Sequence, residues 1–277
     1  PRHNGPRMRS NDDNGSTVLE RAFRLLEALG PEGHSLCLSE LARQARLPKT
    51  TALRLANELV RLRALERTGD SYQLGLRLFE LGATVARQQR LRDAALPFME
   101  DLYEATHETI HLGLLDGLEV LYLEKIVGRR SSTVPTRVGT RRPLYCTGLG
   151  KAILSHSDRK LVNAVLKAGL VRHSPYTITS PQRLTQELAQ ASKEGVAYDQ
   201  EEYKLGTCCV ASPLVGRSGL AVAALSVSGP PGRFVPQHAA AAVRTAALSL
   251  SRAVQGTAVV GRQTTSAQPG RPSTEKS

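Results

Sequence analysis

The side chains best suited to bind a polyanion lie close together near the N-terminus. Between Ser39 and Arg67 the sequence carries seven Lys and Arg against three Glu. Four donor side chains recur there at helical spacing, opposite a stripe of apolar residues, namely Thr50, Arg54, Asn57 and Arg61. Because Lys, Arg, Thr and Asn donate hydrogen bonds both to phosphates and to base edges, this pattern predicts a helix that contacts nucleic acid.

The beginning of this helix is expected to make the sequence-specific contacts. A recognition helix reads bases in the major groove mainly from its N-terminal residues. We therefore expect double-stranded operator DNA to be contacted by Arg46, Lys49, Thr50, Thr51 and Arg54, and by Arg67 in a following hairpin. The alternative is a basic helix face that meets only solvent, and the elements around the helix favour DNA.

Those elements follow the order of a winged helix-turn-helix. Apolar periodicity predicts three helices that open at Thr17, Ser39 and Pro48, the first of them with a capping box to Glu20. A hairpin around Gly69-Asp70 then forms the wing and completes a DNA-binding domain over residues 16–75. In the third helix we expect the buried stripe to be Ala52, Leu55, Leu59 and Leu62.

Two further regions follow this domain. An Arg-rich periodic segment from Leu76 to about Leu91 predicts a linker helix, within a linker over 76–93. Over 94–256, strands joined by hairpins alternate with separate helices, which indicates an α+β domain on an antiparallel sheet. The expected strands are 110–115, 119–126, 196–203, 208–215 and 220–227, and the expected helices are 97–109, 149–155, 158–168, 181–194 and 237–254.

Two motifs invite an enzymatic interpretation, and neither fits its context. Gly148-Leu-Gly-Lys-Ala152 lacks the first Gly and the final Ser or Thr of a phosphate-binding loop. His107 and His111 form the H-E-x-x-H pattern of metalloproteases, but the hairpin pattern that follows places His111 on a strand. Adjacent Cys208 and Cys209 point to opposite faces of a strand and cannot ligate one metal together. We therefore expect no catalytic residues, no metal and no cofactor.

The bulk composition agrees with a DNA-binding protein. The chain of 277 residues has a formal net charge of +12 and 40% hydrophobic residues. No stretch approaches the ~18 uncharged apolar residues of a transmembrane helix, so we expect no membrane partner. Residues 1–15 and 257–277 are polar and aperiodic, which predicts two flexible tails, no signal peptide and a cytoplasmic location. In that compartment the polyanion is nucleic acid.

Four segments in order resemble the IclR family of bacterial transcription regulators. They are Leu38 to Leu55, Arg142 to Ala152, Gly195 to Pro213 and Leu225 to Pro230, within a likeness that runs from about Thr17 to Gly256. The resemblance implies a transcription regulator rather than an enzyme, with a winged helix-turn-helix and a GAF-like effector domain. It also implies homodimers through the DNA-binding domains, and often homotetramers.

The resemblance further implies a pocket for a small-molecule effector. The residues that it assigns to this pocket are Gly148, Leu149, Asp199, Thr207, Cys209, Ser226 and Ser228. Gly148 and Leu149 can offer backbone N–H groups at the start of a helix, which is a ready anion site. Ser226 and Ser228 are two apart on a strand, so their hydroxyls face the same side. Such donors suit a small carboxylate.

Structural roles remain open for several of these residues. Ser226 and Ser228 can simply bond to the neighbouring backbone, Cys209 can be a small buried hydrophobe, and Asp199 can cap a turn. The loop over 129–137 either lines the pocket or is plain surface. A C-terminal domain that only dimerises is the alternative to a sensor. The sequence also leaves open which effector binds, and whether binding represses or activates.

Overall fold

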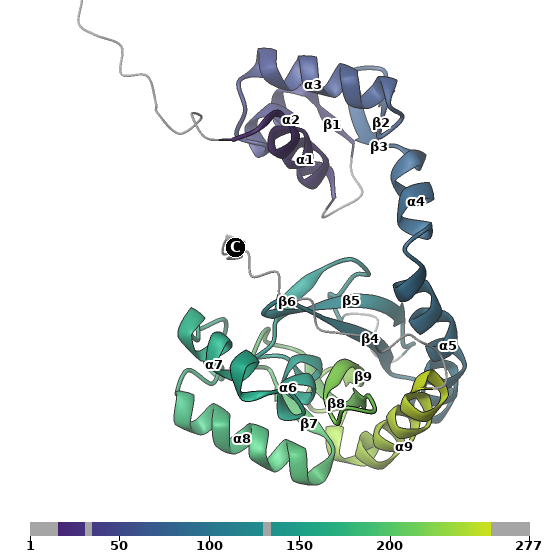
Figure 1. Cartoon of the computed structure of the whole chain (residues 1–277), viewed down its shortest axis with the longest axis vertical. Helices are drawn as coiled ribbons and strands as arrows, with labels where there is room; N and C mark the ends of the chain where they lie inside the picture. The colour runs from purple at the N-terminus through teal and green to yellow at the C-terminus, as the bar shows by residue number, and fades with distance from the viewer. Residues whose placement is uncertain (1–15, 31–34, 130–133, 256–277) are drawn as a thin grey trace, which may run out of the picture. The chain divides into compact units, whose positions relative to one another are not determined.

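The structure, a computed structural model, describes residues 16–30, 35–129 and 134–255. The two expected tails and part of the 129–137 loop lie outside these ranges. The chain divides into two compact units, one that ends at Ala86 and one that begins at Arg87 (Figure 1). Each unit has its own hydrophobic core.

The N-terminal unit is a winged helix-turn-helix, as the sequence predicts. Its three-stranded antiparallel sheet has the strand order β1-β3-β2, and the two-residue strand β1 is too short to show a sequence pattern. The expected capping box is present, since Thr17 Oγ1 accepts from the Glu20 N–H and Glu20 Oε2 accepts from the Thr17 N–H. The elements are α1 (Val18–Leu29), β1 (Leu36–Cys37), α2 (Leu38–Gln44), α3 (Lys49–Arg61), β2 (Leu65–Thr68), β3 (Ser71–Leu74) and α4 (Leu76–Ala83).

The buried stripe of α3 differs from the expected one at its end. Ala52, Leu55, Ala56 and Leu59 are buried against α1 and α2, while Leu62 is 55% exposed. The prediction for Leu62 was wrong because the helix ends at Arg61, so Leu62 no longer follows the helical spacing. The stripe opposite the basic face is therefore one turn shorter than expected.

The linker region also differs from the single helix expected over 76–91. Helix α4 ends at Ala83, and α5 (Ala86–Thr106) begins after Thr84 and Val85, two β-branched residues of low helix propensity. Helix α5 then continues through Pro97, where the sequence pattern had placed a new start. A proline inside a helix costs about 3 kcal/mol or more. Burial of the residues Leu91, Ala95, Met99 and Leu102 along one side of α5 offsets this cost.

The C-terminal unit has the expected α+β architecture. Its six-stranded antiparallel sheet has the order β6-β5-β4-β9-β8-β7, and β6 falls at the end of a segment expected to be a loop. The remaining elements are β4 (Thr109–Asp116), β5 (Glu119–Ile126), β6 (Arg141–Pro143), α6 (Gly148–Ser155), α7 (Arg159–Ala168), α8 (Pro181–Glu194), β7 (Ala197–Gln200), β8 (Cys208–Val215), β9 (Ala221–Gly229) and α9 (Pro236–Gln255).

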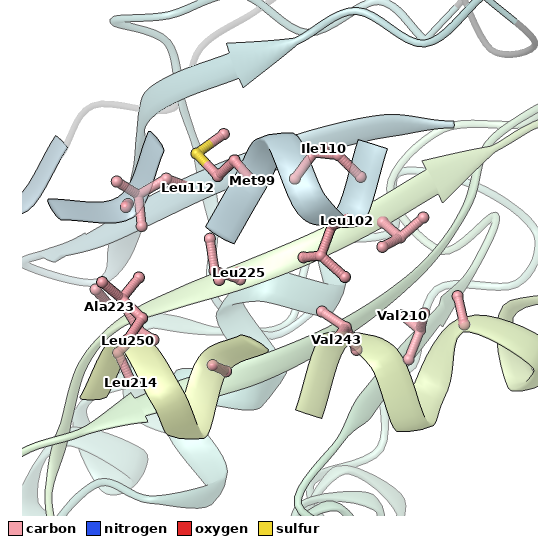
Figure 2. Packing of buried hydrophobic residues seen from close by; sticks show 14 of the residues in the cluster. Met99, Leu102, Ile110, Leu112, Val210, Leu214, Ala223, Leu225, Val243 and Leu250 are labelled. Carbon is pink, nitrogen blue, oxygen red and sulfur yellow. The ribbon is translucent and has the colours of Figure 1, made fainter. Parts of the chain in front are cut away.

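Helices cover both faces of this sheet, so its central strands serve two cores. On one face α5 and α9 pack against β4, β8 and β9, with Met99, Leu225 and Val243 among the buried side chains (Figure 2). On the other face lie α6 and α8. Cys208 belongs to the first core and Cys209 to the second, as the alternation of a strand requires. Polar groups on β8 and β9 are therefore enclosed on either side.

Candidate functional site

The first candidate site is the exposed start of α3. Lys49, Thr50 and Arg54 are exposed and Thr51 is half-buried, while the opposite face of the helix packs into the core. Arg46 precedes the helix in the tight turn after α2 and has a positive φ of 53°, a left-handed conformation that L-residues other than Asn and Asp rarely adopt. Five of the six predicted DNA-contacting residues thus lie around the beginning of one helix.

Arg67, the sixth residue, lies on the hairpin and is held there by local contacts. Its Nε donates to the Gly69 carbonyl oxygen at 2.9 Å, and its guanidinium lies 5.7 Å from the ring centroid of Tyr72. On α3 itself, Arg61 forms an exposed ion pair with Glu58 at 2.9 Å. The row of Thr50, Arg54, Asn57 and Arg61 contains two cations, and Arg54 is the one nearer the start of the helix. The geometry favours Arg54 over Arg61 for contacts to bases.

The second candidate site is a buried row of polar side chains across the C-terminal sheet. Cys209 on β8 pairs with Ser228 on β9, and Ser226 pairs with His111 on β4. The hydroxyls of both serines lie 3.4 Å from His111 Nδ1. All four residues are almost completely buried. The row brings together three of the predicted pocket residues and adds one, His111, which the sequence presents only as part of an H-E-x-x-H pattern.

The start of α6 lies directly over this row. A Cβ atom at Gly148 would lie 2.7 Å from Cys209 Sγ, which is closer than side chains pack. Leu149 is 1% exposed, and its side chain packs against β4 at Gly113. Thr147 caps the helix by accepting from the Gly150 N–H at 3.1 Å. Because Gly148 has no side chain, the first turn of α6, with its outward N–H groups, can approach Cys209 and Ala211 on β8.

His111 is the fourth member of this cluster, and its imidazole ring is neutral. Its Nε2 lies 2.5 Å from Thr136 Oγ1, and its ring meets that of Tyr122 edge-on at 5.2 Å between centroids. Burial, aided by the charge of Lys125, lowers the pKa of His111 to about 3. A neutral imidazole can donate from one nitrogen and accept at the other, so the ring can pair with Thr136 through Nε2 and with the serine hydroxyls through Nδ1. The signal that could have found it is the cross-strand pairing with Ser226.

Asp199 takes the structural role that the sequence left open. Its Oδ1 accepts from the Glu202 N–H at 2.8 Å and so caps the turn after β7. Burial and the nearby carboxylate of Glu202 raise the pKa of Asp199 to about 7. Thr207 lies at the other end of this turn, where its carbonyl oxygen accepts from the Glu201 N–H at 3.2 Å. These contacts of Asp199 and Thr207 stabilise the turn between β7 and β8.

Below α6 lies an ion cluster that the sequence did not indicate. Lys151 is completely buried, and its Nζ contacts Glu202 Oε1 at 2.5 Å and Glu187 Oε1 at 3.2 Å. Burial opposes the charge of Lys151, but the two carboxylates raise the pKa of this residue. The cluster joins α6 to α8 and to the turn after β7, because its three members come from these elements. It therefore fixes α6 above the sheet.

Two classes of site are not found in the described parts of the chain. His107 follows the end of α5 with a positive φ of 54°, and His111 lies on β4, so the H-E-x-x-H residues do not share a helix. Within the ranges 16–30, 35–129 and 134–255 there is no group of three His, Cys, Asp or Glu side chains that could hold a metal ion. No helix in these same ranges is long and apolar enough to cross a membrane.

Both units of the chain are similar to the same family of known proteins. Residues 18–69 match the family model of the IclR helix-turn-helix domain, and residues 83–252 match that of the bacterial transcriptional regulator IclR C-terminal domain. The chain is 36% identical over 245 residues to the HTH-type transcriptional regulator KdgR of Escherichia coli (strain K12), covering 86% of this chain and 92% of that protein. It is 31% identical over 221 residues to the acetate operon repressor of Salmonella typhimurium, covering 78% and 81%.

Two solved structures of the family are similar to the chain. An IclR homologue from Microbacterium hydrocarbonoxydans, complexed with 4-hydroxybenzoate, aligns with a TM-score of 0.79 and 30% identity, covering 87% of this chain and 100% of that one. The IclR of Thermotoga maritima aligns with a TM-score of 0.73 and 31% identity, covering 86% and 98%.

Proposed function

The chain belongs to the IclR family of transcriptional regulators, and from this premise we propose that it controls transcription in response to a small organic carboxylate held in its C-terminal unit. The observation that carries the proposal is the donor cluster beneath α6. There, the hydroxyls of Ser226 and Ser228, the neutral ring of His111 and the first turn of α6 converge. A carboxylate accepts several hydrogen bonds at once, and a helix N-terminus stabilises its charge.

The ligand class can be narrowed by what surrounds these donors. Leu149, Tyr122 and the ring of His111 are buried beside them and offer apolar and aromatic surface. A structural relative is complexed with 4-hydroxybenzoate, an aromatic acid with a hydroxyl group. Aromatic hydroxy acids are therefore the first compounds to try. Gly148, Leu149, Cys209, Ser226 and Ser228 are the proposed contacts, while Asp199 and Thr207 act by holding the adjacent turn.

For DNA, the proposed contacts are the side chains around the start of α3. Lys49, Thr50, Thr51 and Arg54 would enter the major groove, with Arg46 and Arg67 on the flanking backbone. The proposed domains are 16–75 for DNA binding, 76–93 as linker and 94–256 for the effector. We propose a cytoplasmic location, because the operator DNA that the protein would bind lies there.

Control requires that the effector favour one arrangement of the paired DNA-binding units over another. We take the active form to be a dimer or a tetramer of this chain. Large apolar side chains are exposed on α1 and α4, with Leu19 73%, Phe23 61% and Phe79 71% exposed. An interface between copies would cover them. Paired recognition helices must match half-sites about one DNA turn apart, so a small change in their spacing alters affinity.

The test measures ligand binding and DNA binding in parallel on the full chain. Calorimetry with 4-hydroxybenzoate, benzoate and pyruvate is followed by fluorescence anisotropy on DNA from upstream of the chain's own gene. We expect one of the aromatic acids to bind and to change the operator affinity. Ser228→Ala should weaken the acid about tenfold, because it removes one hydrogen bond to a charged group. Ser218→Ala, at an exposed turn, is the matched control.

Two results would contradict the proposal. Acids that bind equally well to the Ser228→Ala and Ser218→Ala variants would place the site elsewhere. An acid that binds the wild-type chain but alters neither operator affinity nor transcription in vitro would favour the alternative, in which the C-terminal unit serves only for dimerisation.

A further inference from the structure

A cavity lies beside the Lys151 cluster and is lined in part by the two carboxylates that contact this lysine, Glu187 and Glu202. It has a volume of about 620 Å³, within the range of small-molecule sites. Its walls come from the 172–180 loop, from one face of α8 and from the edge strand β7 with its following turn. The α8 face presents Arg183, Glu187, Gln190 and Glu194, which recur at helical spacing. This cavity shares no lining residue with the proposed carboxylate site.

Glu202 supplies a fixed acceptor in this cavity. Its backbone N–H donates to Asp199, its carbonyl oxygen accepts from Thr177 Oγ1 at 2.6 Å, and its Oε1 accepts from Lys151 at 2.5 Å. The residue is 5% exposed, yet its Oε2 has no hydrogen-bond partner among the residues that the structure describes. A buried carboxylate oxygen without a donor is unfavourable by about 1–3 kcal/mol or more. Oε2 has less than 1 Å² of exposed surface, so a ligand donor reaches this oxygen only when the Glu202 carboxylate turns toward the cavity, and the new hydrogen bond then removes the penalty.

The charges around the cavity cancel. Glu187, Glu194 and Glu202 line it together with Arg172 and Arg183, and Lys151 lies directly behind two of the carboxylates. Three cations therefore face three anions, so neither an acid nor an amine gains from the net field. What remains is a wall of mixed donors and acceptors, with the amides of Gln190 and Gln200 and the rings of Tyr176 and Tyr198. Hydroxyl groups, which both donate and accept, match such a wall.

We propose that this cavity binds a neutral polyhydroxylated molecule, such as a monosaccharide, with one hydroxyl that donates to the Glu202 carboxylate once this carboxylate turns toward the cavity. Its other hydroxyls contact the amides and the charged groups of α8 and β7. The rings of Tyr176 and Tyr198 lie against its C–H faces. The contacts are a few hydrogen bonds made partly in solvent, so the affinity is on the order of millimolar.

The test uses nuclear magnetic resonance of the full chain with labelled isoleucine methyl groups. Ile178 lines the cavity, and Ile110 lies in the other core, so their signals report on the cavity and on the rest of the unit. The probes are D-glucose, D-xylose and myo-inositol, with D-glucuronate and putrescine as an acid and an amine of similar size. We expect at least one neutral polyol to shift Ile178 in a saturable manner and to leave Ile110 unchanged.

Matched variants on α8 assign the binding to this cavity. Gln190→Ala removes a lining amide and should weaken the polyol about fivefold to tenfold, whereas Gln186→Ala, exposed on the same helix and not among the lining residues, should change nothing. Glu202→Gln should weaken binding further. If the Glu202→Gln variant fails to fold, the comparison of Gln190→Ala with Gln186→Ala still tests the proposal.

Three outcomes would overturn the proposal. These are the absence of any Ile178 shift with the three polyols, tighter binding of glucuronate or putrescine than of every polyol, and equal affinities in the Gln190→Ala and Gln186→Ala variants. The measurement involves neither DNA nor an aromatic acid, so its result is independent of the proposed effector site.

Discussion

The start of α3 and the cluster beneath α6 use similar hydrogen-bond donors under opposite conditions. At α3 the donors are charged and exposed, so water solvates them until a partner arrives. Beneath α6 the groups are neutral and buried, and they hydrogen-bond to one another around His111. The difference shows two routes to recognition. The exposed face gains affinity from charge and tolerates change, whereas the buried cluster gains selectivity from fixed geometry and tolerates little.

The largest expected effect is in the buried region. Glu202→Ala leaves Lys151 without its closest carboxylate in a completely buried position, and we expect a loss of about 3–5 kcal/mol in the free energy of unfolding. Glu194→Ala, on the exposed face of α8, should change the stability by less than about 0.5 kcal/mol. Urea denaturation monitored by circular dichroism measures both. Equal free energies of unfolding for the Glu202→Ala and Glu194→Ala variants would contradict the expected difference between a buried and an exposed charge.

A smaller effect is expected from a single methyl group at the start of α6. Gly148→Ala places a Cβ atom against Cys209 Sγ, so we expect a loss of about 1–3 kcal/mol in stability and loss of carboxylate binding. Gly82→Ala, in open space on α4, should instead stabilise the protein by about 0.4–1 kcal/mol. Thermal unfolding with and without ligand distinguishes the two. A Gly148→Ala variant that binds normally would mean that α6 does not contact the ligand.

On the exposed face of α3, a substitution should change the affinity for operator DNA without changing the free energy of unfolding. Arg54→Ala should reduce operator affinity by about 1–3 kcal/mol and leave the unfolding free energy within about 0.5 kcal/mol of the wild type. Arg61→Ala, later on the same helix and paired with Glu58, should reduce the sequence preference less. Anisotropy titrations on specific and random DNA measure both. The assignment of base contacts to the helix start fails if Arg61 proves the more important residue.

A pH dependence of stability also belongs to the buried cluster. The folded-state pKa of His111 is about 3, against an ordinary value of 6.5, so the unfolded chain binds the extra proton between these values. This residue therefore contributes stability above pH 6.5 that is lost as the pH falls toward 3, with a slope of at most about 1.4 kcal/mol per pH unit. His111→Asn should flatten this part of the profile in urea titrations from pH 7 to pH 4.5. An unchanged slope in the His111→Asn variant would show that groups other than His111 determine the pH dependence of stability.

Local patterns predicted most of the fold because they reflect local physics. Strand β8 was expected at its observed bounds, 208–215, and helix α8 at 181–194, since turns and a proline mark their ends. The continuous helix through Pro97 could not be foreseen, because it depends on burial against a distant sheet. For the same reason, sequence reasoning found Ser226 and Ser228 through family motifs but missed His111 and Glu202. Those two residues acquire their roles only from partners far away in the chain.

The contact between Gly148 and Cys209 also bears on how such a regulator can diverge. Position 148 accepts no side chain while Cys209 lies beneath it, so selection must keep it unchanged whatever the ligand. Leu149, next along the helix, packs against a glycine on β4, so a change in its size alters the space beneath the start of α6. Duplicated genes could therefore explore new effectors by substitution at position 149, while the neighbouring glycine preserves the anchor for the acid group.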